Sequence, residues 1–225
     1  MKAAVTTEFG TIEYKDVPVP GIAGDEALIN VACSGVCGTD VHVFQGHHPA
    51  AKPPVIMGHE FSGTVAEVGD KNPAGLEPGQ RVAVQPFYSC GVCELCITGR
   101  ENVCPDLKIF GIHVDGSFAE YVKAPIKRVY PIPGDLEFGI AALIEPLAVA
   151  LHDVRSSGFT VGNTAMIIGG GPIGLLIAKI AELNGASEIL VTELNPFRKK
   201  LLSDSGFTVL DPGETDILEE VWERT

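Results

Sequence analysis

The chain has 225 residues, 45% of them hydrophobic and 20% charged, so it can bury a core as one large domain or as two small ones. Sixteen basic residues against twenty-nine acidic ones give a net charge of -13 without any long basic run, which argues against nucleic acid and membrane surfaces as partners. The segment Met1–Val5 lacks the apolar region of a signal peptide, and no apolar run approaches the ~18 residues of a membrane span, so we expect a cytoplasmic protein.

Short runs of β-forming residues, separated by glycine and proline, fill the chain as far as about residue 135. Spacing of this kind is typical of a compact β domain, built as a barrel or a sandwich. The sequence therefore predicts a β-rich N-terminal domain. The clearest runs are Thr11–Tyr14, Ala27–Val31, Gly63–Val68, Arg81–Val84 and Ala119–Val122.

Two short motifs in this β region combine a thiol, imidazoles and carboxylates. They are Cys37-Gly38-Thr39-Asp40-Val41-His42 and Gly58-His59-Glu60. Zinc accepts mixed sulfur, nitrogen and oxygen ligands, and a catalytic zinc keeps one position open for water or substrate. We expect Cys37 and His59 to be two ligands of such a zinc ion.

The third ligand of this site is open between two carboxylates. Glu60 can bind the metal directly or support the site from behind, and Glu145 is also placed to serve. A single cysteine or histidine is more often part of a hydrophobic core, and we interpret Cys33 in that way. The case for Cys37 and His59 therefore depends on what accompanies them.

A dense cysteine cluster is the strongest local signal in the chain. Its pattern is Cys90-x2-Cys93-x2-Cys96-x7-Cys104. Four thiolates so close in sequence can surround a tetrahedral zinc at ~2.3 Å with no open position, which predicts a structural site. An iron–sulfur centre and a pair of disulfides are the alternatives; the sequence only partly matches the first, and the expected compartment disfavours the second.

The texture of the chain changes after Leu136, where helical runs rich in alanine, leucine and isoleucine begin. A helix is predicted to open at Glu145-Pro146 and to close at Gly158, with proline and glycine at their favoured ends. Strand, glycine turn, helix and strand then follow, the order of a parallel α/β sheet. We place the domain boundary between residues 155 and 156.

A glycine-rich turn follows the predicted strand Thr164–Ile168 and precedes the predicted helix Leu175–Leu183. It fits the dinucleotide-binding pattern G-x-G-x-x-G, which is weak alone but stronger between a strand and a helix. The glycines allow a tight turn and the close approach of a pyrophosphate to the helix N-terminus. The residues assigned to this site are Gly169, Gly171, Pro172, Ile173 and Gly174.

An acidic residue ends the next predicted strand, at Glu193. A carboxylate in this position accepts hydrogen bonds from the ribose hydroxyls and repels a 2′-phosphate, which favours NAD over NADP. Arg198 and Lys199 lie a few residues later and weaken that preference slightly. Glu193 and Arg198 complete the predicted cofactor-binding set.

With these motifs in hand, the chain resembles the zinc-containing medium-chain alcohol and polyol dehydrogenases. The resemblance rests on both zinc motifs, the glycine turn, and the segments Gly35-Val36-Cys37, Gly116-Ser117-Phe118-Ala119-Glu120-Tyr121 and Glu145-Pro146-Leu147-Ala148. It implies a GroES-like β domain with two zinc ions, followed by a Rossmann domain. Glu145 stands where the ethanol dehydrogenases have cysteine, which makes the sequence more similar to the sorbitol, threonine and butanediol dehydrogenases.

The resemblance also implies a reaction. Zinc would bind the hydroxyl of a secondary alcohol, a polyol or a similar small molecule, and lower its pKa, while hydride passes to NAD. Thr39 and His42 match the family's proton relay. L-Threonine 3-dehydrogenase and butanediol dehydrogenase activities are the alternatives, and a homo-oligomer, dimer or tetramer, is expected of the full-length form.

Residues 156–225 account for the first half of a Rossmann domain only, with a third strand near Phe207–Leu210 and a last helix at Asp216–Arg224. We therefore expect an incomplete doubly wound sheet, a truncated chain and little hydride transfer by the chain alone. Two other interpretations are a non-catalytic zinc-binding protein and a metal-free reductase of the same superfamily. The presence of Cys37, His59 and Glu145 argues against the metal-free reductase.

Overall fold

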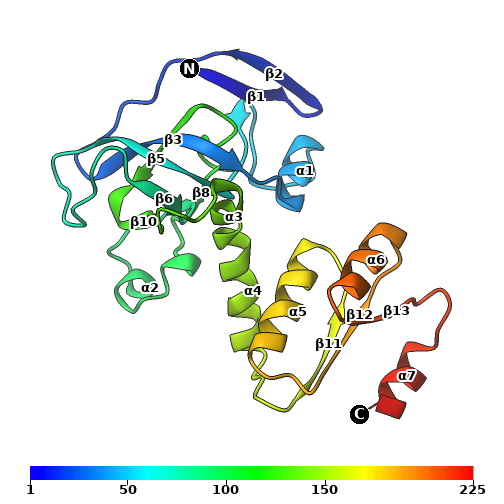
Figure 1. The fold of residues 1–225 in the computed structure, drawn as a ribbon. Helices are drawn as coiled ribbons and strands as arrows, with labels where there is room; N and C mark the ends of the chain where they lie inside the picture. Colours follow the sequence, from blue (N-terminus) through cyan, green and yellow to red (C-terminus); the bar gives the residue numbers. More distant parts are fainter. Residues whose placement is uncertain (225) are drawn as a thin grey trace. The chain divides into compact units, whose positions relative to one another are not determined.

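The computed structural model describes residues 1–224 and divides into two compact units, Met1–Glu145 and the part that begins at Pro146 (Figure 1). The first unit consists mainly of antiparallel strands, and the second alternates strands with helices. A β-rich domain followed by a parallel sheet confirms the predicted fold class.

Five antiparallel strands form the main sheet of the first unit, in the order β10-β6-β5-β3-β9. Apolar and β-branched residues pack on it, and Ile29, Phe61 and Val82 are almost completely buried there. Four of the five β runs predicted from sequence contribute to this sheet. Its strands are β3 (Glu26–Ser34), β5 (Phe61–Val68), β6 (Arg81–Val84), β9 (Tyr121–Pro125) and β10 (Val129–Pro131).

A smaller antiparallel sheet, in the order β2-β1-β4, contains the N-terminal hairpin. The hairpin turns at Gly10, whose φ of 82° favours glycine. An isolated bridge between Ala3 and Ala119 links this sheet to the segment before β9. The strands are β1 (Lys2–Glu8), β2 (Thr11–Asp16) and β4 (Val55–Ile56).

Short elements complete the first unit. The helix α1 (Gly38–Phe44) follows β3. The two-stranded pair β7–β8 forms the base of the segment that contains Cys90, Cys93, Cys96 and Cys104, which we call the four-cysteine lobe. The remaining elements are β7 (Phe87–Tyr88), α2 (Glu94–Ile97), η1 (Glu101–Val103), β8 (Lys108–Ile109), η2 (Ile126–Arg128) and α3 (Phe138–Ala142).

The second unit contains a three-stranded parallel sheet in the order β11-β12-β13. Its core packs Ala178, Val191 and Leu202 from two helices and the central strand. The expected order of strand, glycine turn, helix and strand is present. The elements are α4 (Ile144–Ser156), β11 (Thr164–Ile168), α5 (Pro172–Leu183), β12 (Glu188–Thr192), α6 (Pro196–Asp204), β13 (Thr208–Leu210) and α7 (Ile217–Arg224).

The units divide ten residues before the boundary expected from sequence, because the helix α4 packs with the second unit. Ala150 and Val154 on α4 share a buried cluster with Ile180 on α5. The boundary predicted between residues 155 and 156 left most of this helix in the first domain. The buried face of α4 places most of the helix in the second unit.

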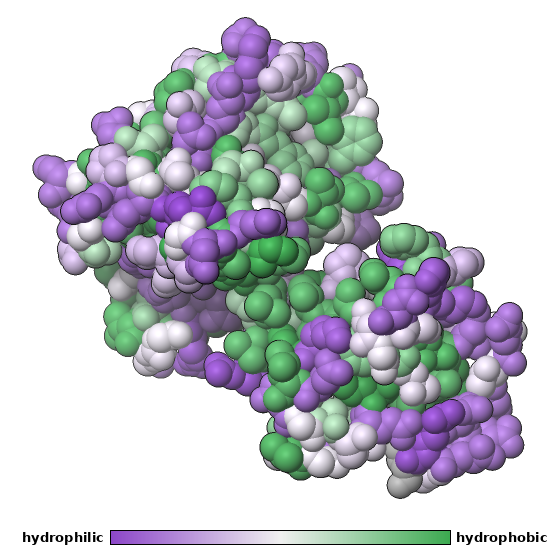
Figure 2. Space-filling model, in the orientation of Figure 1, coloured by the Kyte–Doolittle hydropathy of each residue, from purple (hydrophilic) through white to green (hydrophobic). Residues whose placement is uncertain are grey.

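Hydrophilic and hydrophobic residues are interspersed on the visible face of both units (Figure 2). Among the described residues, no helix is both long enough and apolar enough to span a membrane.

The strand β11 lies at one edge of the parallel sheet, and Ile168 at its end is 88% exposed. The second unit therefore presents an apolar sheet edge.

Candidate metal centres and nucleotide-binding turn

The main sheet brings the first metal motif together. Strand β3 ends at Ser34 and pairs there with Phe61, the first residue of β5. Cys37 follows the end of β3, and His59 and Glu60 precede the start of β5, so all three meet at one end of this strand pair. Their candidate ligand atoms all lie within 4.8 Å of one another. This spacing suits one zinc ion at about 2.0–2.3 Å from each donor.

Asp40 connects the two halves of this site, although sequence reasoning gave it no role. One oxygen of its carboxylate, Oδ2, accepts a 2.8 Å hydrogen bond from the Cys37 N–H, and Oδ1 accepts a 3.1 Å bond from the Gly58 N–H. Oδ1 also lies 3.5 Å from Nδ1 of His59. A carboxylate behind a histidine in this way orients the ring and leaves Nε2 for the metal.

The environment of His59 fits a cation. The residue is 7% exposed, and its Nδ1 is buried without a well-aligned hydrogen-bond partner. Burial lowers the pKa of His59, but the Asp40 carboxylate and the Cys37 thiol outweigh this effect and raise it to about 10. The site therefore attracts positive charge at this position, which a metal ion supplies when the ring is neutral.

Glu60 and Glu145, the two candidates for the third ligand, differ in their placement. The side chain of Glu60 belongs to the group with Cys37 and His59, whereas that of Glu145 does not. Glu145 is half-buried, and desolvation raises its pKa; His59 opposes this increase and Glu60 adds to it. A Cβ on Gly35 would lie 2.4 Å from the Glu60 carboxylate, so this glycine makes room for the side chain. The geometry favours Glu60 as the third donor.

A junction of three glycines supports the segment that carries His59. Gly58 has a φ of 94°, and a Cβ there would lie 2.5 Å from the Phe118 ring. A Cβ on Gly116 would lie 2.0 Å from the carbonyl oxygen of Gly58, and one on Gly111 would lie 2.7 Å from its nitrogen. The three backbones are therefore in direct contact, which fixes the chain immediately before His59.

The predicted relay residues lie on the helix α1. Cys37 is the N-cap of this helix, Thr39 is half-buried in its first turn, and His42 is exposed near its end. The ring centroid of His42 lies 6.3 Å from that of His47. Placement on one short helix with Cys37 is compatible with the relay, which stays a prediction.

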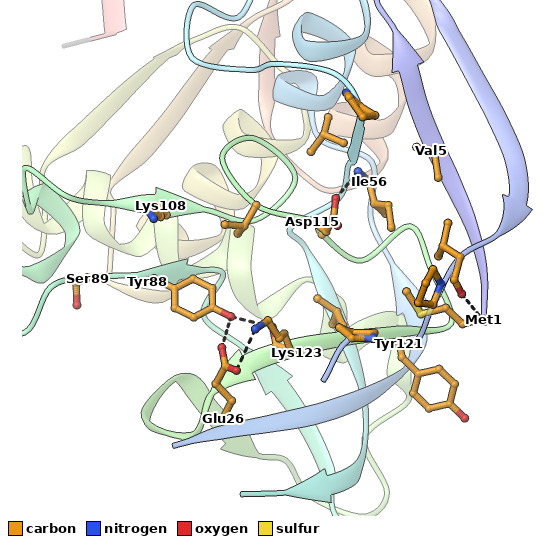
Figure 3. Close-up of a pocket in the computed structure, with 18 of the residues that line it drawn as sticks. Met1, Val5, Glu26, Ile56, Tyr88, Ser89, Lys108, Asp115, Tyr121 and Lys123 are labelled. Atoms are coloured by element: carbon orange, nitrogen blue, oxygen red, sulfur yellow. Dashed lines mark hydrogen bonds and ion pairs between the residues drawn. The ribbon is translucent and has the colours of Figure 1, made fainter. Parts of the chain in front are cut away.

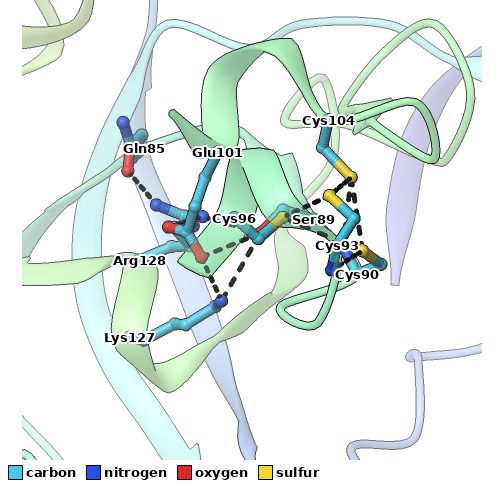
Figure 4. A network of polar contacts seen from close by, with 9 residues as sticks. All are labelled: Gln85, Ser89, Cys90, Cys93, Cys96, Glu101, Cys104, Lys127 and Arg128. Atoms are coloured by element: carbon cyan, nitrogen blue, oxygen red, sulfur yellow. Dashed lines mark hydrogen bonds and ion pairs between the residues drawn. The ribbon is translucent and has the colours of Figure 1, made fainter. Parts of the chain in front are cut away.

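The sulfurs of the four clustered cysteines all lie within 4.8 Å of one another (Figure 4). Four of their sulfur–sulfur distances lie between 3.5 and 3.9 Å. A tetrahedron with Zn–S bonds of ~2.3 Å has edges of about 3.8 Å, so the arrangement fits one zinc ion. The sulfurs are too far apart for disulfides, which need about 2.05 Å.

The thiols of this cluster differ in their protonation. Backbone N–H groups of Val92 and Cys93 lower the pKa of Cys90 to about 6. Burial raises the pKa of Cys96 to about 12, so this thiol stays protonated without a metal. Metal binding requires thiolates, and zinc would therefore displace protons from this site.

A separate cavity of about 830 Å³ opens in the first unit (Figure 3). At one end, Glu26 accepts hydrogen bonds from the Tyr88 hydroxyl at 3.0 Å and the Lys123 ammonium at 3.1 Å. Burial opposes ionisation of Glu26, but its hydrogen bonds lower its pKa, while burial raises that of Tyr88. Cys37, His59 and Glu60 do not line this cavity, which is therefore distinct from the first metal site.

The predicted nucleotide-binding turn is built as the sequence pattern requires. Gly171 is the N-cap of α5, and Pro172 begins the helix with Ile173 beside it. A Cβ on Gly174 would lie 2.0 Å from the Gly169 carbonyl oxygen, so helix and turn contact each other closely. At Gly171 the nearest atom to a Cβ would be Nη1 of Arg198 at 3.7 Å, which leaves room for a ligand beside the helix N-terminus.

The carboxylate of Glu193 lies beside this turn. Its oxygens accept hydrogen bonds from the N–H groups of Gly170 at 3.1 Å, Leu194 at 2.8 Å and Asn195 at 2.8 Å. These bonds lower the pKa of Glu193, that from Asn195 most, and Arg198 adds an ion pair at 3.7 Å. The acid stays ionised and fixed, as expected of a residue that receives a ribose.

The chain is similar to known proteins over nearly its whole length. The alcohol dehydrogenase GroES-like domain family matches residues 23–134. The chain is 40% identical to L-threonine 3-dehydrogenase of Bacillus velezensis and 40% identical to sorbitol dehydrogenase of Bacillus subtilis, in each case over 98% of the chain. The matches cover 65% and 64% of those two proteins.

Solved structures give the same result. The fold superposes on 2R,3R-butanediol dehydrogenase from Bacillus subtilis with a TM-score of 0.91 and 33% identity, over 100% of this chain and 67% of that one. A zinc-binding dehydrogenase from Sinorhizobium meliloti, bound to NADP, has a TM-score of 0.91 and 40% identity, with 97% and 64% covered. The chain belongs to the zinc-dependent medium-chain dehydrogenases, and it spans about 65% of the length of the curated relatives.

Proposed function

We propose that the protein containing this chain is a zinc-dependent oxidoreductase, which transfers hydride from a secondary alcohol, such as a polyol, to NAD. The observation that carries the proposal is the group of Cys37, His59 and Glu60, whose ligand atoms lie within 4.8 Å. A structural zinc alone would not require this second, mixed-donor group. Sorbitol, L-threonine and 2R,3R-butanediol are the substrates to test, because relatives with those names are similar to the chain.

In this proposal the chain's own residues hold the reaction in place. Cys37, His59 and Glu60 would bind the zinc ion, and Asp40 would orient His59 from behind. The zinc would act as a Lewis acid that lowers the pKa of the substrate hydroxyl. Thr39 and His42 would carry the released proton along α1 to solvent, where His42 is exposed.

On the nucleotide side, we propose that the N-terminus of α5 binds the pyrophosphate and that Glu193 accepts from the ribose hydroxyls. The ionised carboxylate of Glu193 would repel a 2′-phosphate and favour NAD. Arg198 lies beside it, and the similar structure from Sinorhizobium meliloti is bound to NADP, so the test includes both nucleotides. Glu193→Ser would shift the preference toward NADP.

The first experiment measures metal content and nucleotide binding of the purified chain. We expect two zinc ions per chain, one of which is lost in Cys37→Ser, and binding of NAD detected by calorimetry. Unchanged zinc content in Cys37→Ser would contradict the first site. A protein of the relatives' length then tests the substrates; no oxidation of any secondary alcohol would refute the proposed activity.

We propose further that the chain by itself binds zinc but transfers hydride poorly. The observation in favour is its three-stranded parallel sheet, in which the edge strand β11 leaves Ile168 exposed beside the nucleotide turn. Robust oxidation of a polyol by the purified chain would contradict this.

We also propose a cytoplasmic location and a homo-oligomeric full-length form. Cell fractionation would test the location, and light scattering would test the oligomeric state.

A further inference from the structure

The four-cysteine lobe is attached to the rest of the first unit by a small polar network (Figure 4). Two of its members, Ser89 and Glu101, belong to the lobe. The other two, Lys127 and Arg128, belong to the 3-10 helix η2, which leads into the edge strand β10 of the main sheet. We call these four residues the polar clamp.

The lobe side of the polar clamp contacts both ends of the metal loop. Ser89 directly precedes Cys90, the first cysteine. Glu101 begins the 3-10 turn that delivers Cys104, and its carbonyl oxygen accepts a 3.2 Å hydrogen bond from the Cys104 N–H. The Ser89 hydroxyl also donates to Glu101 Oε1 at 3.2 Å, so the two ends of the loop are joined to each other.

The sheet side of the polar clamp is rigid because Arg128 is fixed from several directions. Its side chain is 6% exposed, and its guanidinium lies 4.0 Å from the centroid of the Phe87 ring. Nη1 donates to Gln85 Oε1 at 2.7 Å, and the Gln85 N–H donates to the Arg128 carbonyl oxygen at 2.9 Å. Arg128 is therefore held by Gln85 and Phe87 as well as by Ser89 and Glu101.

Charged hydrogen bonds join the two sides. Nη2 of Arg128 donates to Glu101 Oε2 at 2.5 Å and to the Ser89 hydroxyl at 3.0 Å. Lys127, which is half exposed, donates to Glu101 Oε1 at 2.9 Å. A hydrogen-bonded ion pair between a buried arginine and a carboxylate is stronger than an ion pair of an exposed lysine. The pair of Arg128 and Glu101 therefore contributes most to the attachment of the lobe.

We propose that Glu101 and Arg128 are positioning residues for the four-cysteine metal site: they hold both ends of the loop together without metal and so slow the release of zinc. Ordering a flexible loop opposes metal binding, and a loop that is already ordered binds more tightly. The proposal rests on a metal at the four cysteines and is independent of hydride transfer.

The test follows the lobe thiols one by one in the purified zinc-loaded chain. With a chelator present, an alkylating reagent labels each cysteine as zinc leaves, and peptide mass mapping separates the lobe thiols from Cys37. We expect Glu101→Gln to speed labelling of the four lobe cysteines about 10-fold, the lower end of the loss of metal affinity that is typical of residues supporting metal ligands. Labelling of Cys37 stays unchanged and serves as the internal control.

Three further variants sharpen the test. Glu13→Gln removes an exposed ion pair with Lys15 on the N-terminal hairpin and is the matched control, with wild-type labelling expected. Lys127→Met should give a smaller increase than Glu101→Gln, and Arg128→Lys an intermediate one. Arg128→Lys also guards against misfolding, because it keeps the buried positive charge.

A measurement on the zinc-free chain separates positioning from simple loss of structure. Hydrogen exchange of residues 89–105 should remain slow in the zinc-free wild type and become fast in zinc-free Glu101→Gln. Wild-type labelling rates in Glu101→Gln would overturn the proposal, and so would equal acceleration at Cys37, which would indicate general loosening. Absence of zinc from the lobe in the wild type would instead remove the metal assignment itself.

Discussion

The two metal centres of the first unit are assembled in opposite ways. The four-cysteine site takes all its donors from one loop, between Cys90 and Cys104. The mixed site takes Cys37 from one strand end and His59 with Glu60 from another, so it exists only when β3 and β5 are paired. The comparison teaches that the first site depends on local order and the second on the sheet.

Their immediate surroundings differ in the same direction. The lobe is held by contacts of Ser89 and Glu101 with the 3-10 helix η2, outside the sulfur tetrahedron. The mixed site is held from inside by Asp40, which contacts both ligand segments. Loss of a lobe residue should therefore change zinc binding only at the four cysteines, and it should also lower the stability of the protein. Loss of Asp40 should first lower the zinc affinity of the mixed site.

The largest expected effect is that of a lobe ligand. Cys104→Ser should remove one zinc ion per chain and lower the free energy of unfolding by about 3 kcal/mol or more, because a structural metal contributes directly to folding. Metal analysis and chemical denaturation measure both. Cys33→Ser is the control, since Cys33 belongs to neither cluster. Unchanged zinc content in Cys104→Ser would break the comparison.

Next comes the choice between the two glutamates of the mixed site. Glu60→Gln should weaken zinc binding there by more than about 100-fold, beyond the 10–100-fold loss usual for a supporting residue. Glu145→Gln should change it by less than about 10-fold, because Glu145 lies outside the ligand group. Competition with a zinc chelator measures both variants. The reverse ranking would make Glu145 the third ligand.

A smaller loss is expected at Asp40. Asp40→Asn keeps the shape of the side chain but removes the charge behind His59, so zinc affinity at the mixed site should fall about 10- to 100-fold. Zinc in the four-cysteine lobe should be unaffected. Site-resolved labelling of Cys37 against Cys104 distinguishes the two sites, and equal loss at both would contradict separate supports.

The smallest effect is expected at Glu26, which belongs to neither group of candidate metal ligands. Glu26→Gln should lower the free energy of unfolding by about 1–2 kcal/mol at pH 7, because it removes the charged hydrogen bonds from Lys123 and Tyr88. The folded-state pKa of Glu26 is lowered, so this stability is present above its unfolded pKa and is lost as the pH falls through the folded value. Denaturation at pH 7 and at pH 3 measures the difference, and equal costs at both would contradict it.

Much of the fold follows from local sequence patterns. The strand β11, the glycine turn and the helix α5 combine an apolar run, four glycines and a proline at the first helical position, and all of these signals lie within one short segment. The helix α6 carries comparable local signals, with Asn195 as its N-cap and Pro196 at its start. The sequence interpretation was strongest where neighbouring residues decide the structure.

The mixed metal site shows where the sequence stops. Cys37, His59 and Glu60 were all named as candidates, but only pairing of β3 with β5 separates Glu60 from Glu145. Asp40 was part of the motif and received no role, because its partners, Gly58 and His59, lie eighteen and nineteen residues away. An acid three residues after the helix N-cap was the available signal.

The glycine junction beside His59 has a consequence for protein engineering. A side chain at Gly111 or Gly116 would collide with the backbone of Gly58, and one at Gly58 would collide with Phe118 and Ser117. A library that randomises these positions to alter substrate preference would return mostly unfolded variants. Val36 and Val41 lie near Cys37 in the sequence and are 72% and 46% exposed. Diversity introduced at these two positions leaves the glycine junction intact.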